Sequence, residues 1–134
     1  MQEKTAYLLQ NQLNPFPVSG ELTLEGSRLR FALDEKAAEA NLGWLEKALA
    51  TEGLKDRIKR GERPVVFDLD VQGRKISWPA SLARIGMKIP DEDRNWFVSL
   101  DYPSNGAIWQ TLNIIGGGKR SKPWKEALSS AGAA

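Results

Sequence analysis

A glycine run followed by basic residues stands near the C-terminus, in the stretch GGGKRSKPW at 116–124. Loops that hold nucleotide phosphates have the form G-x-x-x-x-G-K-[ST], with the glycines between a strand and the start of a helix. Here Asn113 replaces the first glycine and Arg120 replaces the hydroxyl residue. The run also follows an expected helix, so we interpret it as the helix terminus and not as a phosphate-binding loop.

The residues after the glycines form a first candidate binding site. Lys119, Arg120 and Lys122 stand beside Trp124. A tryptophan exposed among cations suits the centre of a protein-binding patch. The spacing thus predicts a site at Lys119, Arg120, Lys122 and Trp124 for a partner protein.

A second basic cluster lies in the middle of the chain. At helical spacing, Lys55, Lys59, Arg60 and Arg63 fall opposite the apolar Leu54 and Ile58. This pattern favours an alternative function, a peripheral binder of anionic lipid or nucleic acid. The pattern is more often that of a solvated helix face. Because the net charge of the chain is only +2, we expect no nucleic-acid partner.

Carboxylates are the remaining side chains that could take part in catalysis or bind a metal ion. Asp68 and Asp70 share one face of an expected strand, and Asp91, Glu92 and Asp93 share a turn, so either group suggests a hard cation or acid–base work. Neither has the further ligands of a calcium loop, and a polar strand face and a polar turn explain them. The chain has no His and no Cys, which excludes imidazole triads and thiolate chemistry. A carboxylate-dependent hydrolase is therefore the third hypothesis, behind a non-catalytic protein without metal or cofactor.

A hairpin is the clearest structural element in the sequence. The stretch GELTLEGSRLRFAL at 20–33 alternates apolar and polar residues on both sides of Gly26-Ser27. A two-residue turn pairs Leu24 with Leu29 and Leu22 with Phe31 on one face. Glu25 then meets Arg28.

Further strands follow from the same alternation. A second hairpin at 65–78, turning at Gln72-Gly73, would pair Leu69 with Ile76 and Phe67 with Trp78. A third hairpin runs from 84 to 102 around a turn at 90–95, with Tyr102 continuing the inward face. A weaker strand at 5–12 brings the expected total to seven.

Helical patterns fill the remaining segments. Asp34 is the candidate N-cap of a long helix, and a shorter helix follows a break at 51–53, so a helical insertion covers about 35–60. Helices are also expected at 104–115 and 122–128. The residues 129–134 are small and predict a disordered tail.

Seven strands followed by a helix with a tryptophan, Trp109 in GAIWQTLNII, resemble the pleckstrin-homology-like (PH-like) superfold, and in particular its small bacterial members. The stretch GELTLEGSRLRF is similar to the second and third strands of PH and GRAM domains. The resemblance implies a partly open barrel that serves as a docking platform rather than an enzyme. The loop at 14–20 matches the one where phosphoinositide-binding members carry basic residues, and it has none. Inositol-lipid recognition is therefore not expected.

We thus expect one α+β domain over 1–134. It would be a seven-stranded antiparallel curled sheet or partly open barrel, with a helical insertion between the third and fourth strands and a C-terminal helix. Its expected role is a non-catalytic binding or adaptor module for a protein of unknown identity. No apolar stretch is long enough for a signal peptide or a membrane span, which favours the cytoplasm. The oligomeric state stays open, since the edge strands of an open barrel can pair between chains.

Overall fold

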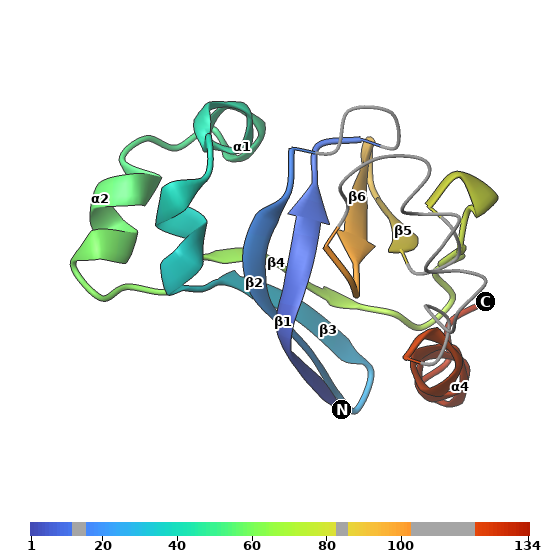
Figure 1. Ribbon diagram of the computed structural model, residues 1–134. Helices are drawn as coiled ribbons and strands as arrows, with labels where there is room; N and C mark the ends of the chain where they lie inside the picture. Colours follow the sequence, from blue (N-terminus) through green and yellow to red (C-terminus); the bar gives the residue numbers. More distant parts are fainter. Residues whose placement is uncertain (12–15, 83–85, 103–119) are drawn as a thin grey trace.

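The computed structural model describes residues 1–11, 16–82, 86–102 and 120–134 (Figure 1). Its framework is a curled antiparallel sheet in the order β4-β3-β2-β1-β6-β5. The expectation of seven strands is wrong, because the described residues form six: β1 (Gln2–Leu9), β2 (Val18–Glu25), β3 (Arg28–Leu33), β4 (Val65–Asp70), β5 (Gly86–Asp91) and β6 (Arg94–Ser99).

The first hairpin is confirmed in its register. Across β2 and β3, Leu24 pairs with Leu29, Leu22 with Phe31, and Glu25 with Arg28. The turn residue Gly26 has φ +60°, a conformation that glycine adopts without steric cost. Alternation and turn chemistry therefore agree, and a slip of one residue would move every leucine to the outer face.

The prediction of the second hairpin is wrong for the residues after its turn. β4 pairs with β3, and the residues after Gly73 leave the sheet, so Ile76 does not face Leu69 and Trp78 does not face Phe67. Only Ser77 forms a bridge, and its partner is Lys88 on β5. Pro79 lies just beyond and has no backbone N–H to continue a ladder. The expected strand is thus reduced to one bridge.

The third hairpin is confirmed where the structure describes it, since Met87 pairs with Val98 and Ile89 with Trp96. Its turn is tighter than expected and spans Glu92 and Asp93. β6 ends at Ser99, whose Oγ accepts a hydrogen bond of 3.2 Å from the backbone N–H of Asp101. This local turn replaces the ladder, so the alternation does not reach Tyr102.

The segment between β3 and β4 is helical, but it does not contain one long helix. It forms η1 (Glu35–Glu39, a 3-10 helix), α1 (Gly43–Leu49) and α2 (Leu54–Lys59). Asp34 caps η1 as expected, accepting from the N–H of Ala37 at 3.2 Å. Asn41 then accepts from the N–H of Gly43 at 3.0 Å, a local bond that ends one helix before the next begins.

Among the residues described after β4, two further segments are helical: η2 (Ala80–Leu82, a 3-10 helix) and α4 (Ser121–Ser130). α4 confirms the expected terminal helix and extends it at both ends. The helix expected at 104–115 and the glycines at 116–118 lie outside the described residues. No helix in the described part of the chain is both long and apolar enough to cross a membrane.

The core lies on the inner face of the sheet, closed by the helices. Phe31, Phe67 and Trp96 stack there with ring centroids about 6 Å apart, at 6.0 and 5.8 Å. Other buried members come from the sheet and from the helices: Leu8, Val18, Leu22, Leu33, Met87, Ile89, Val98, Leu45, Leu54, Ile58, Trp124 and Leu128.

The C-terminal tail is ordered, contrary to the expectation of disorder over 129–134. α4 continues to Ser130, and the backbone then binds the turn after β4. Gly73 N–H donates to the carbonyl of Gly132 at 2.8 Å, and Ala134 N–H donates to that of Arg74 at 2.8 Å. Small side chains allow this close backbone approach, so the composition that suggested fraying instead permits docking.

Arg74 also joins the two edge strands of the sheet. Its Nε donates to the carbonyl of Asp70 on β4 at 2.8 Å, and its Nη1 donates to the carbonyl of Pro90 on β5 at 2.8 Å. One guanidinium therefore bridges the open side of the curled sheet and covers edge carbonyls that would otherwise be free to pair with another chain.

Candidate functional site

The first predicted site does not form the expected patch. Trp124 is fully buried, at 0% exposure, and its Nε1 donates to Glu3 on β1 at 3.0 Å. Arg120 forms ion pairs with Glu3 and with Asp101. Lys122 is exposed, and Lys119 lies outside the described residues. Trp124 therefore does not meet the condition of exposure on which its role in this site depends, because α4 packs its apolar face into the core and its Arg120 pairs with Glu3 and Asp101.

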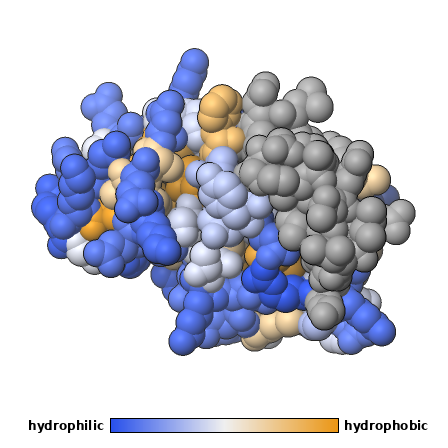
Figure 2. Space-filling view, viewed as in Figure 1, coloured by the Kyte–Doolittle hydropathy of each residue, from blue (hydrophilic) through white to orange (hydrophobic). Residues whose placement is uncertain are grey.

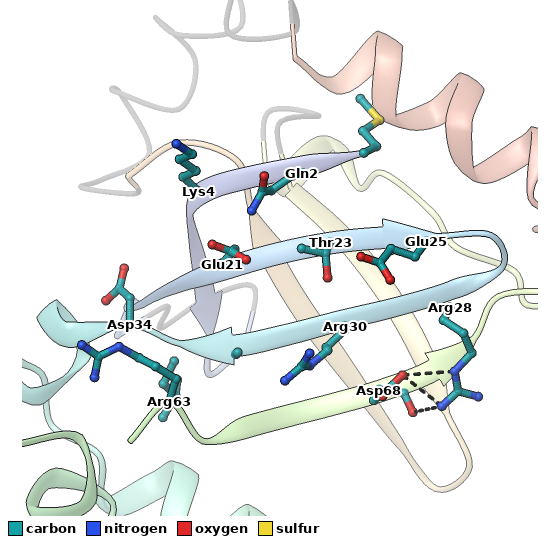
Figure 3. Close-up of a pocket in the computed structure, with 13 residues that line it drawn as sticks. Gln2, Lys4, Glu21, Thr23, Glu25, Arg28, Arg30, Asp34, Arg63 and Asp68 are labelled. Atoms are coloured by element: carbon teal, nitrogen blue, oxygen red, sulfur yellow. Dashed lines mark hydrogen bonds and ion pairs between the residues drawn. The ribbon is translucent and has the colours of Figure 1, made fainter. Parts of the chain in front are cut away.

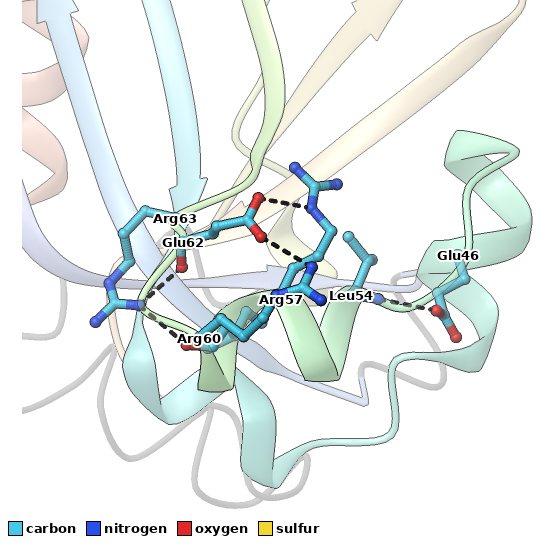
Figure 4. A network of polar contacts seen from close by, with 7 residues as sticks. Glu46, Leu54, Arg57, Arg60, Glu62 and Arg63 are labelled. Carbon is cyan, nitrogen blue, oxygen red and sulfur yellow. Dashed lines mark hydrogen bonds and ion pairs between the residues drawn. The ribbon is translucent and has the colours of Figure 1, made fainter.

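The second predicted site is an exposed basic surface, on a helix that faces the core through Leu54 and Ile58 (Figure 4). Lys55, Lys59, Arg60 and Arg63 are all exposed. Glu46 of α1 accepts from the N–H of Leu54 at 3.1 Å and so fixes the start of α2. The amphipathic helix expected from the spacing is therefore confirmed only for Leu54–Lys59; Arg60 caps its C-terminus, and Arg63 lies beyond it, after Gly61 with φ +95°.

The acidic candidates have structural partners. Asp68 forms an ion pair of 2.9 Å with Arg28 across the neighbouring strand. The Asp70 carboxylate accepts from the N–H of Gln72 at 2.9 Å, and this hydrogen bond lowers the pKa of Asp70 below its ordinary value of 3.8. Within the described ranges, no three acidic side chains gather into a group able to hold a metal ion. The hydrolase hypothesis receives no support from this arrangement.

The outer face of β1 to β4 forms a shallow polar groove of about 750 Å³ (Figure 3). Basic and acidic side chains line it in equal number: Lys4, Arg28, Arg30 and Arg63, against Glu21, Glu25, Asp34 and Asp68. Neighbouring strands place these charges across from one another, as for Glu25 opposite Arg28 and Arg30 opposite Asp68. A groove without net charge favours neither an anion nor a cation, so cross-strand pairing accounts for it.

A second groove, of about 510 Å³, is lined by aromatic rings. Tyr7 of β1, Phe16 and Pro17 before β2, and Tyr102 after β6 form its apolar lining, which we call the aromatic groove. Phe16 is 56% exposed and Tyr102 is 58% exposed. The rings of Tyr7 and Tyr102 meet edge to face, with centroids 5.3 Å apart. Two large apolar side chains thus share one depression on the surface.

The backbone holds Phe16 in an unusual conformation. Its φ is +40°, in the left-handed region that side chains other than glycine and asparagine rarely adopt. Such strain persists only where the surrounding structure enforces it, and it gathers at ligand-binding positions. Phe16 precedes Pro17, a position at which extended backbone with negative φ is favoured, so its positive φ also departs from the local preference.

Sequence reasoning missed this groove for two reasons. The resemblance to PH domains directs attention to basic residues in the loop at 14–20, whereas the signal in this loop is an aromatic residue between two prolines. The alternation also placed Tyr102 inward, which is wrong because the strand ends at Ser99. The groove combines Tyr7 of β1, the residues around the start of β2, η1 with the residues after it, and Tyr102 beyond β6, so no local pattern contains it.

No protein-family model matches this chain, and no curated protein matches its sequence. Among solved structures, the chain is similar to the pleckstrin homology domain of ArhGAP27, at 12% identity over 98% of both chains and a TM-score of 0.46. The chain thus bears a weak resemblance to a PH domain in its fold. A likeness of this degree says nothing about a ligand or a partner.

Proposed function

We propose that this domain is a non-catalytic binding module that holds a segment of a partner protein in the aromatic groove. The observation that supports the proposal is the pair of side chains at Phe16 and Tyr102, each more than half exposed and both lining one groove. Clustered exposed apolar side chains are costly in water and mark interaction surfaces more often than scattered ones do.

The composition of the groove favours an apolar side chain as the anchor of that segment. Its aromatic walls bury apolar area, and its rim is polar, with Ser19, Lys36, Glu39 and Asn41. An aromatic centre with a polar rim is the usual arrangement of a protein-binding hot spot. One lysine and one glutamate give the rim no net charge, so a charged ligand gains little there.

The size of the groove favours a short segment over a broad folded surface. A volume of about 510 Å³ accommodates a few side chains. The edge-to-face contact of Tyr7 with Tyr102 holds one wall of the groove in place before binding. A preorganised groove loses less conformational entropy when it binds.

Selection of short random peptides on the purified domain tests this proposal. We expect the selected peptides to carry one or two large apolar residues, and Phe16→Ala and Tyr102→Ala each to weaken their binding by about tenfold or more. Val65→Ala is the matched control, because Val65 is also exposed, at 41%, but lies on β4 outside the groove. Peptides that bind all three variants as well as the parent would overturn the assignment.

The melting temperatures of the same variants provide a second criterion. If the two rings serve a partner, their loss should change the melting temperature by only about 2 °C, as for other exposed side chains. A large fall in both variants would mean that the rings pack within this chain, and the groove would then not be a free surface.

A further inference from the structure

Positive charge is concentrated on α2 and the residues after it. Between 54 and 63 the chain has five basic residues and only two acidic ones, Asp56 and Glu62, a surplus of three positive charges. The whole chain has a net charge of +2, so the remainder carries a slight negative surplus. We call the five basic residues the α2 basic surface: Lys55, Arg57, Lys59, Arg60 and Arg63.

The helix is oriented so that this charge faces solvent. Leu54 and Ile58 are buried in the core and anchor α2 on its other side. Lys55 and Lys59 are four positions apart, so they lie one above the other on the exposed face. The side chain of Arg60 is 68% exposed. The surface is therefore accessible along its length.

One carboxylate holds two of the guanidinium groups side by side (Figure 4). Glu62 Oε1 accepts from Arg57 Nε at 3.1 Å, and its Oε2 accepts from Arg60 Nη2 at 3.1 Å. One negative charge faces two positive ones, so the cluster keeps a net positive charge. The other N–H groups of both guanidiniums have no partner among the described residues and remain available to a ligand.

Arg63, at the border between this surface and the polar groove, is held by backbone carbonyls. Its Nη1 donates to the carbonyl of Glu62 at 2.8 Å and to that of Ile58 at 3.5 Å. A carbonyl orients a guanidinium without neutralising it. Three arginines are thus positioned before any ligand arrives, which distinguishes this surface from a row of freely moving lysines and reduces the entropy lost on binding.

We propose that the α2 basic surface binds a short acidic segment of a protein, at a place separate from the aromatic groove. Planar guanidiniums match carboxylates with two parallel hydrogen bonds each. The exposed face of α2 has no large apolar residue to enter a membrane, since Leu54 and Ile58 are buried. A long nucleic acid would extend past α2 onto the remainder of the chain, whose slight negative surplus opposes it.

Binding of a labelled glutamate octapeptide to the purified domain, followed by fluorescence anisotropy, tests the inference. A glutamine octapeptide of the same length is the control ligand. We expect binding of the glutamate peptide alone, weakened about tenfold or more by the triple substitution Arg57→Gln, Arg60→Gln and Arg63→Gln. The matched control variant removes three positive charges elsewhere, outside the aromatic groove: Lys4→Gln, Lys75→Gln and Lys122→Gln. This control variant should change the affinity by less than about twofold. If both variants lose affinity equally, the binding depends only on the net charge of the chain, and the proposal is overturned.

A lysine variant separates geometry from charge and also serves if the glutamine variant fails to fold. When Arg57, Arg60 and Arg63 are all changed to lysine, the positive charge stays but the planar guanidinium groups are lost. We therefore expect the affinity for the glutamate peptide to fall about fivefold. Unchanged affinity would contradict the role of the positioned guanidiniums. Vesicles containing phosphatidylserine and a single-stranded oligonucleotide complete the test. Tighter binding to either than to the glutamate peptide would assign the surface to lipid or nucleic acid instead.

Discussion

The indole Nε1 of Trp124 donates a hydrogen bond of 3.0 Å to the carboxylate of Glu3, across 121 positions of the chain. The other carboxylate oxygen of Glu3 lies 3.7 Å from the guanidinium of Arg120. One acidic residue on β1 therefore holds the start of α4 by two contacts. The tryptophan that looked like a binding residue is the anchor of the last helix.

Removal of the Trp124 ring should destabilise the domain strongly. We expect Trp124→Ala to lower the free energy of unfolding by about 3–5 kcal/mol, as for other buried aromatic residues. Trp124→Phe keeps most of the apolar contact but leaves Glu3 without its N–H donor, so a loss of about 1–2 kcal/mol is expected. Urea denaturation measures both values. A loss below about 1 kcal/mol in the alanine variant would mean that α4 does not pack as described.

Gly20 should tolerate no side chain. A Cβ at this position of β2 would lie 2.5 Å from the carbonyl oxygen of Ala32 and 2.5 Å from the ring of Phe31. We expect Gly20→Ala to cost about 2–3 kcal/mol or more through overpacking. Gly26→Ala is the control, because a Cβ at this position would meet no other atom. Only the positive φ of Gly26 opposes the change, so we expect a loss of about 1 kcal/mol in the free energy of unfolding. If thermal or chemical denaturation shows the same loss of stability in Gly20→Ala and Gly26→Ala, the close contact at Gly20 is refuted.

Loss of the Arg74 side chain should loosen the open side of the sheet. Arg74→Gln removes its donors to Asp70 and Pro90, and we expect a cost of about 1–2 kcal/mol. Hydrogen exchange should become faster at the N–H groups of Ser77 and Lys88, which form the neighbouring bridge. Arg28→Gln is the control, because its exposed ion pair with Asp68 should be worth less than about 1 kcal/mol. Unchanged exchange at the bridge in the Arg74 variant would argue against this role.

Glu62 should titrate below its ordinary range. Hydrogen bonds from Arg57 first, and then from Arg60, lower the pKa of Glu62 below 4.5. A carboxyl whose pKa is lower in the folded state stabilises the fold above its ordinary pKa and loses that contribution as the pH falls through the folded value. This contribution should therefore be constant from pH 7 down to about pH 5.

An NMR titration of the Glu62 side chain measures that shift. In Arg57→Gln, which removes the largest cause, the pKa should return toward 4.5. Lys55→Gln is the control, because it removes a neighbouring charge that makes no hydrogen bond with Glu62. It should change the pKa of Glu62 less than Arg57→Gln does. A pKa of Glu62 that is the same in the parent and in Arg57→Gln would contradict the geometry of the cluster.

Local patterns predicted the parts of the fold that depend on neighbours in the sequence. The register of Leu24 with Leu29, the cap at Asp34 and the basic face of α2 all follow from alternation, turn chemistry or helical spacing. Each is settled within a dozen residues, where side-chain periodicity alone decides which face is buried. The α2 basic surface was therefore visible in the sequence, although the clustering of its arginines around Glu62 was not.

The tertiary structure alone decided where the ends of these elements meet. Ile76 and Trp78 alternate like a strand, yet β4 already pairs with β3 and the chain crosses to β5 instead. Trp124 is buried because β1 offers Glu3 to its indole, and Tyr102 is exposed because β6 stops at Ser99. The aromatic groove likewise combines segments from four places in the chain. Such contacts depend on which surfaces remain free after the sheet has formed, and residue spacing along one segment does not contain that information.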